Sequence, residues 1–227
     1  MIRIASSVEF GKLITALSSD VVDANIHWRL YCDLHEAIKA QPIVWAQSRT
    51  FWQMTLNAHA ETAIEHLCRV FDQEESAFHM LSWLKTIKKY IHLFDTVEFK
   101  RRLADNPFVD SLAEDSRSPD LVVLETDIND CTKTNLLVKR LMVHRANAVA
   151  HRSAKQITSD KPLPLELTLS IKDLEALLSR ARTVLNRYSQ LFAAETYSVS
   201  MIGCDDYKYI FTSIASAVER SRDAAWG

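Results

Sequence analysis

The chain has 227 residues, of which 48% are hydrophobic and 25% are charged, and its formal net charge is −2. This composition is typical of an ordinary globular protein, and so small a charge gives no general attraction to nucleic acid or membranes. The only glycines are far apart, at Gly11, Gly203 and Gly227. Their wide spacing excludes the Gly-rich phosphate loops, which need several glycines close together. Their small number argues against an all-β fold with many tight turns.

Between the five prolines, apolar residues recur every three or four positions, which is typical of amphipathic helices. This periodicity predicts an all-α bundle of about six to seven long antiparallel helices. We expect a single domain over 1–227, with a core of about 7–195 and a C-terminal helix. The predicted helices are 7–39, Pro42 to about 72, 77–92, about 96–104, 118–153, 170–195 and 205–225, with a loop at 105–120 and an extended segment at 158–169.

Capping residues mark where several of these helices begin. Ser76 is placed to cap one helix, and residues 118–120 (Ser-Pro-Asp) combine a cap, a first-turn proline and an acid. Ser170 and Asp173 form a capping-box pattern, with Asp in place of the usual Glu or Gln. We therefore expect these boundaries to be set locally.

The cysteines and the N-terminal segment predict a cytoplasmic protein. Cys32, Cys68, Cys131 and Cys204 form no CxxC pair and no zinc-site spacing, which favours reduced thiols. The first ten residues lack the apolar core of a signal peptide. No apolar run approaches the ~18 residues of a membrane span, so we expect no membrane association.

Residues 131–159 carry the most uneven local charge. They contain no Asp or Glu, although acidic residues lie just before them. Two interpretations stay open, because bases near the end of a helix complement its macrodipole and the same bases would also form a phosphate-binding surface. The basic residues are Lys133, Lys139, Arg140, Arg145, Arg152 and Lys155, and His144 and His151 lie among them.

A helical wheel places Arg145 on an otherwise apolar face. Burying an unpaired guanidinium is costly, so Arg145 either pairs with an acid on another helix or lines a cleft at an interface. His144, Asn147 and His151 share another stripe of the same helix. The apolar residues around Arg145 are Leu137, Val138, Leu141, Met142, Ala148 and Val149.

The stretch 144–152, His-Arg-Ala-Asn-Ala-Val-Ala-His-Arg, resembles the R-x4-6-H motif of the HEPN superfamily. That superfamily comprises small α-helical domains, many of them ribonucleases of toxin–antitoxin, CRISPR and phage-defence systems. The AbiU-like abortive-infection branch looks most similar, because its motif tends to end in Ala-His-Arg. The stretch 67–72, followed by Ser76 and Leu81, is also similar to that branch, and the resemblance covers roughly residues 7–195.

The resemblance implies a metal-independent ribonuclease without a cofactor. His151 would transfer a proton, Arg145 would bind phosphate, and Asn147 would orient His151 or donate to the phosphate. It also implies a homodimer with a composite site, which suits two side chains that diverge by about 120° on a straight helix. RNA is the expected substrate, a cognate antitoxin protein a further partner, and the expected RNA contacts are His144, Arg152, Arg140, Lys139 and Lys155.

One residue departs from the family pattern. The position after the motif arginine is usually polar in the family, and here it is Ala146. The alternative therefore stays open that the chain is a non-catalytic HEPN module that binds RNA or a partner protein. Arg29 and His35 have the same spacing, but acids lie nearby and no Asn lies between them, which favours the later motif.

Three other groups of side chains favour a structural interpretation over a functional one. His59 and His66 could share a metal with His27 or His35, although paired polar positions on a long helix are the favoured interpretation and no metal site is predicted. The tryptophans of the predicted helices favour core or dimer contacts. A solvated face that could extend an RNA track contains Lys85, Lys88 and Lys89.

Overall fold

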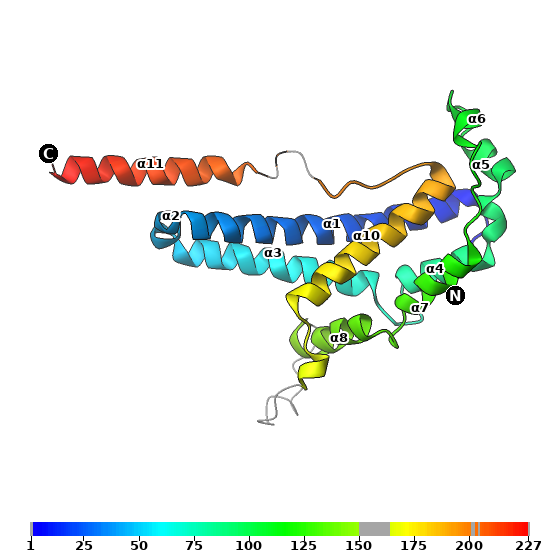
Figure 1. Cartoon of the computed structure of the whole chain (residues 1–227), viewed down its shortest axis with the longest axis horizontal. Helices are drawn as coiled ribbons and strands as arrows, with labels where there is room; N and C mark the ends of the chain where they lie inside the picture. Colours follow the sequence, from blue (N-terminus) through cyan, green and yellow to red (C-terminus); the bar gives the residue numbers. More distant parts are fainter. Residues whose placement is uncertain (1, 150–163, 201–202, 204, 227) are drawn as a thin grey trace. The chain divides into compact units, whose positions relative to one another are not determined.

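The computed structural model describes residues 2–149, 164–200, 203 and 205–226 (Figure 1). These residues contain ten α-helices, eight of them with at least seven residues, and no strand, so the predicted all-α class is confirmed and the helices are slightly more numerous than predicted. They fall into two compact groups. Unit 1 comprises Met1–Val22 and Glu65–Tyr197, and unit 2 comprises Asp23–Ile64 and Ser198–Gly227. The single domain expected from the sequence stays a prediction.

Unit 2 is built from a helical hairpin and the C-terminal helix. The elements are the later part of α1 (Ser7–Ala40), α2 (Pro42–Gln47), the first part of α3 (Arg49–Val70), and α11 (Tyr207–Trp226). The sequence predicted one helix from Pro42 onward, but the backbone leaves the helical region at Ser48. The break lets α2 and α3 contribute to one core, which contains Leu34, Ile38, Val44, Trp52, Leu56 and Phe211.

Unit 1 holds the remaining helices around an aromatic core. Phe10 of α1 lies 6.2 Å from Trp83, 5.5 Å from Phe94 and 4.8 Å from Phe192, measured between ring centroids. Trp52 and Trp83 are both buried, as expected of core tryptophans. The helices are α4 (Met80–Lys89), α5 (Thr96–Arg102), α6 (Val109–Leu112), α7 (Leu121–Asp130), α8 (Leu136–His144) and α10 (Ile171–Ala193), with 3₁₀ turns at Ile91–Phe94 and Leu165–Leu167 and a π-helical turn at Arg145–Val149.

The long helix predicted over 118–153 is wrong. Helix α7 ends at Asp130, and α8 begins only after Asn135, whose side chain accepts a hydrogen bond from the Leu137 N–H. The connection is held from outside, because the Gln73 side chain donates to the Cys131 carbonyl at 3.0 Å and accepts from the Lys133 N–H at 3.0 Å. A tertiary contact thus separates two helices that the periodicity joined.

Local capping explains other boundaries. Ser170 and Asp173 form the predicted capping box at the start of α10. The predicted cap Ser76 is wrong, because His79 caps α4: its Nδ1 accepts from the Ser82 N–H at 3.3 Å. The loop predicted at 105–120 contains the short helix α6, and 165–167 form a 3₁₀ turn where an extended segment was expected.

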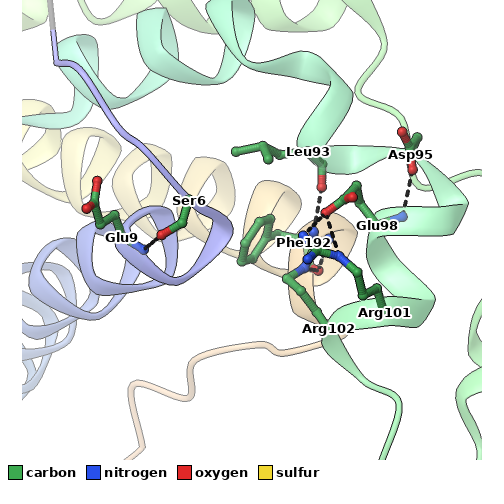
Figure 2. A network of polar contacts seen from close by, with 8 residues as sticks. All are labelled: Ser6, Glu9, Leu93, Asp95, Glu98, Arg101, Arg102 and Phe192. Atoms are coloured by element: carbon green, nitrogen blue, oxygen red, sulfur yellow. Dashed lines mark hydrogen bonds and ion pairs between the residues drawn. The ribbon is translucent and has the colours of Figure 1, made fainter.

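Segment 95–118, whose role is not predictable from its sequence, contacts the C-terminal end of α10. Arg102 donates to the Phe192 carbonyl from Nε at 3.2 Å and from Nη2 at 2.8 Å, and its Nη1 donates to Leu93 (Figure 2). Arg117 donates to the Gln190 carbonyl at 3.3 Å. Cations at the last turn of a helix satisfy its carbonyls and complement its dipole, so this segment stabilises the end of α10.

Candidate functional site

Helix α8 and the π-helical turn after it carry all the predicted site residues that the structure describes. Asn135 caps α8, and Val138 and Leu141 are fully buried, which fixes the face that α8 turns to the core. A π-helical turn uses i→i+5 hydrogen bonds, is rare, and often occurs at functional sites. Here it begins at Arg145, so the predicted motif starts where the helix changes its geometry.

Arg145 forms an ion pair with Asp72, which follows the end of α3. Arg145 Nη1 lies 2.8 Å from Asp72 Oδ2, and the side chains are 37% and 15% exposed. Of the two alternatives left open by the sequence, the structure therefore shows the pairing with an acid on another element. A guanidinium has five N–H donors, and that of Arg145 makes no other hydrogen bond or ion pair in the described part of the chain.

Asp72 is itself held by the backbone. Its Oδ1 accepts from the N–H groups of Gln73 at 2.7 Å and Glu74 at 3.1 Å. Burial acts to raise the pKa of Asp72, but these backbone N–H groups and Arg145 outweigh it and lower the pKa below its usual value. The carboxylate is thus a fixed anchor for Arg145.

Asp72→Asn is expected to lower the stability of the protein near pH 7 and to have a smaller effect in acid. The Asn oxygen still accepts from the backbone, so the substitution removes mainly the charge. Because the folded-state pKa of Asp72 is lowered, its contribution is present above the unfolded-state pKa of about 3.9 and is lost as the pH falls through the folded-state pKa. Urea midpoints at neutral and acidic pH measure the difference.

The exposed pair Lys100–Asp110 provides the control for this prediction. Exposed ion pairs contribute little, so Asp110→Asn is expected to shift the urea midpoint only slightly at either pH. If the urea midpoints of wild type and Asp72→Asn differ equally at both pH values, the charge of Asp72 does not stabilise the fold.

The other described motif residues make local contacts. The Asn147 side-chain amide donates to the Val143 carbonyl at 2.7 Å, so it satisfies an acceptor of its own helix. His144 is half-buried, and burial lowers its pKa, which favours the neutral imidazole. Buried Cys68 lies close to Arg145 and Asp72, but burial raises the pKa of its thiol to about 12, which favours the protonated thiol near neutral pH.

Arg140 faces α10 instead of Asp72. Its Nη1 contacts both carboxylate oxygens of Asp173, at 2.9 and 3.1 Å, and its Nε donates to the Glu166 carbonyl at 2.8 Å. This contact anchors α8 to the start of α10. Lys139 is exposed and has no ion-pair partner among the described residues. The other predicted site residues, His151, Arg152 and Lys155, lie outside the described residues.

The sequence profile of the AbiU2 family, a HEPN family, matches residues 7–210 of the 227-residue chain. The chain belongs to the AbiU2 family. The family resemblance expected from the stretches at 67–72 and 144–152 is thereby confirmed, and the match extends beyond the expected end at about 195. No match was found among the curated proteins or among the solved structures.

In this AbiU2-family protein, the ion pair joins the two stretches that carried the resemblance. Asp72 ends the first stretch, and Arg145 lies near the start of the second. Sequence reasoning missed Asp72 as a site residue, although its place in the first stretch was the available signal. The two stretches are far apart along the chain, so only the folded structure shows that they meet.

The histidines considered for a metal contact different partners. His27 Nδ1 lies 3.0 Å from His59 Nδ1 in unit 2, and His66 Nδ1 lies 2.8 Å from Asp20 in unit 1. Within the described part of the AbiU2-family chain, no three His, Cys, Asp or Glu side chains are grouped as metal ligands. None of the described helices is both long and apolar enough to span a membrane.

Proposed function

We propose that the chain is a metal-independent ribonuclease of a phage-defence or toxin–antitoxin system, acting on RNA as a homodimer in the cytoplasm. The observation that carries this proposal is Arg145, a partly exposed guanidinium on a π-helical turn in an AbiU2-family protein. Asp72 engages one Nη group, and the 37% exposed side chain leaves further donors for a ligand.

The proposed reaction is cleavage of the RNA backbone by the adjacent 2′-hydroxyl. The 2′-oxygen attacks phosphorus, its proton passes to a base, and the 5′-oxygen leaves with a proton from an acid, so that a 2′,3′-cyclic phosphate forms. An imidazole has a reference pKa of about 6.5 and suits either proton transfer, which is the role proposed for His151. Arg145 would stabilise the negative charge that develops on the phosphate oxygens.

Asp72 and Asn147 would orient the other groups of this site. Asp72 holds Arg145 in one orientation, so less conformational freedom is lost when phosphate binds. Asn147 already donates to Val143, so it would have to exchange this hydrogen bond to contact His151 or phosphate. In the proposed homodimer, the second protomer would supply the other half of the site, and a cognate antitoxin would block it.

Purified protein is expected to cleave a fluorescent single-stranded RNA equally well with and without EDTA. A cyclic phosphate at the end of the product resists alkaline phosphatase until acid opens the ring, which identifies the proposed chemistry. Cleavage that EDTA abolishes would contradict the metal-independent mechanism. No cleavage in either buffer, with folded protein, would contradict the nuclease proposal.

A non-catalytic HEPN module that binds RNA or a partner protein is the second candidate. Two observations favour it: Arg145 is paired within the chain, and the Asn147 amide is used by its own helix. Ala146, where the family usually has a polar residue, agrees with this alternative. The same assay separates the two candidates, because the module would bind the RNA without cleaving it.

A further inference from the structure

A polar hollow of about 590 Å³ lies in unit 1, next to the segment that holds Arg145. Its walls come from the connection after α3, α4 with its N-cap, the end of α7 and the α7–α8 connection. Gln73 lines it and directly follows Asp72, the ion-pair partner of Arg145. The hollow and the candidate site are therefore connected through one peptide bond of the chain.

The inner wall of the hollow is already hydrogen-bonded. Gln73 Nε2 donates to the carbonyls of Phe71, Asp72 and Cys131 at 2.8 to 3.0 Å. His79 accepts from the Ser82 N–H at Nδ1 and contacts the Glu74 carbonyl through Nε2 at 3.1 Å, which places its proton on Nε2. These groups form a rigid frame and need no ligand.

The Thr132 and Thr134 hydroxyls complete this frame. Thr132 Oγ1 donates to the Asn129 carbonyl at 2.8 Å and lies 2.6 Å from Thr134 Oγ1. A hydroxyl carries one hydrogen, so Thr134 donates in the second contact and both hydroxyl hydrogens are used within the frame. The connection between α7 and α8 is thus fixed before any ligand binds.

The rim, in contrast, carries donors without partners. Lys85 and Lys133 line the hollow, and neither has an ion-pair partner among the described residues. The Asn129 side chain also has no hydrogen-bond partner in that part of the chain. Lys88 and Lys89, on the same helix as Lys85, differ: Lys88 pairs with Glu125, and Lys89 lies over the Tyr90 ring.

The charge of the hollow favours an anion. Burial lowers the pKa of His79, so it adds no charge near neutral pH, and Glu75 is the acid among the lining residues. Two ammonium groups therefore outweigh one carboxylate. Lysine and Asn side chains are among the groups with which proteins contact the phosphates of nucleic acids.

We propose that this hollow binds the sugar–phosphate backbone of an RNA strand, with Lys85 and Lys133 on phosphates and Asn129 donating to a phosphate oxygen. The inference rests on the proposed function for the identity of the ligand, and it does not depend on catalysis. Because Gln73 lines the hollow and directly follows Asp72, a strand bound there would run beside the Asp72–Arg145 pair. The hollow thus positions RNA flanking the scissile phosphate.

The test measures binding of a fluorescent single-stranded 2′-O-methyl RNA, in which the attacking hydroxyl is blocked and cleavage cannot occur. The Lys85→Gln/Lys133→Gln variant is expected to bind about tenfold to thirtyfold more weakly at ~0.1 M salt. The slope of log affinity against log salt should decrease by about 1.4, because two phosphate contacts to a single strand are lost.

The matched control is Lys88→Gln/Lys100→Gln, which removes the same charge from two lysines that are paired with Glu125 and Asp110. It is expected to stay within about twofold of wild type at the same salt. Equal weakening by both double variants, or none by Lys85→Gln/Lys133→Gln, overturns the inference. Displacement of the RNA by polyglutamate at equal charge also overturns it, since the hollow would then recognise acidic chains in general.

The binding proposal and the nuclease proposal are refuted by different results. If unmodified RNA stays intact while the 2′-O-methyl strand binds in a Lys85- and Lys133-dependent way, the hollow is supported and the nuclease proposal is not. If cleavage occurs and depends on Arg145 while the lysine variant keeps the wild-type KM, the nuclease stands and the hollow is refuted.

Discussion

Arg145→Ala is expected to lower the rate of RNA cleavage by about 10²–10³-fold, the usual cost of losing a group that stabilises transition-state charge. Arg145→Lys keeps a positive charge beside Asp72 but loses the planar two-pronged grip on phosphate, so it should fold like wild type and remain strongly impaired. His151→Ala should cost about 10²–10⁴-fold, because it removes the proposed proton transfer. Single-turnover cleavage of a fluorescent RNA measures each rate.

Arg69→Ala is the control, because Arg69 is an exposed arginine of α3 with its own ion pairs to Glu65 and Asp20. It should cleave at nearly the wild-type rate. Mixing the Arg145→Ala and His151→Ala chains tests the composite site: random exchange should restore about a quarter of wild-type activity if each site takes the two groups from different protomers. No recovery after verified subunit exchange would mean that both groups act within one chain.

Asp127→Ala is expected to lower the free energy of unfolding by about 2 kcal/mol, since the buried Tyr188 hydroxyl loses its acceptor and the partly exposed Arg187 loses its counter-ion. Asp127 of α7 is only 8% exposed. It pairs with Arg187 and accepts from the Tyr188 hydroxyl at 2.7 Å, both on α10. The substitution therefore removes the only acceptor that the described residues provide for these two groups. Urea unfolding followed by circular dichroism measures the loss.

Asp120→Ala serves as the control for this prediction. Asp120 lies on the surface at the start of the same helix, where its carboxylate accepts from the Val122 and Val123 N–H groups. Losing such a cap costs about 1 kcal/mol. If Asp127→Ala costs no more than Asp120→Ala, the contacts to α10 do not contribute net stability.

The sequence predicted those parts of the fold that local chemistry determines. The helix 7–39 corresponds to α1, and the capping box of Ser170 and Asp173 begins α10 as expected. The interruption between α7 and α8 was not predictable from periodicity, because it depends on Gln73, a residue distant in the sequence. The His79 cap was missed because histidine is not among the usual capping residues.

The candidate site was predicted only in part. The family followed from the motif, whereas the cost of burying a guanidinium left two alternatives for Arg145, and only the structure shows its pairing with Asp72. The partner Asp72 was missed, because many acids precede the motif and its place in the stretch 67–72 was the signal that set it apart. Likewise, Lys85 was grouped with Lys88 and Lys89 on the helix, and their different neighbours distinguish them only in three dimensions.

The contact that the Gln73 side chain makes with the α7–α8 connection depends on an intact amide. Its amide donates to three carbonyls, and slow deamidation would turn it into a carboxylate with no hydrogen to give. Negative oxygens would then face the carbonyls of Phe71, Asp72 and Cys131, a repulsion that loosens the linkage between the two segments. In a stored sample, the contact between the segment after α3 and the α7–α8 connection would thus weaken while the helices stay intact.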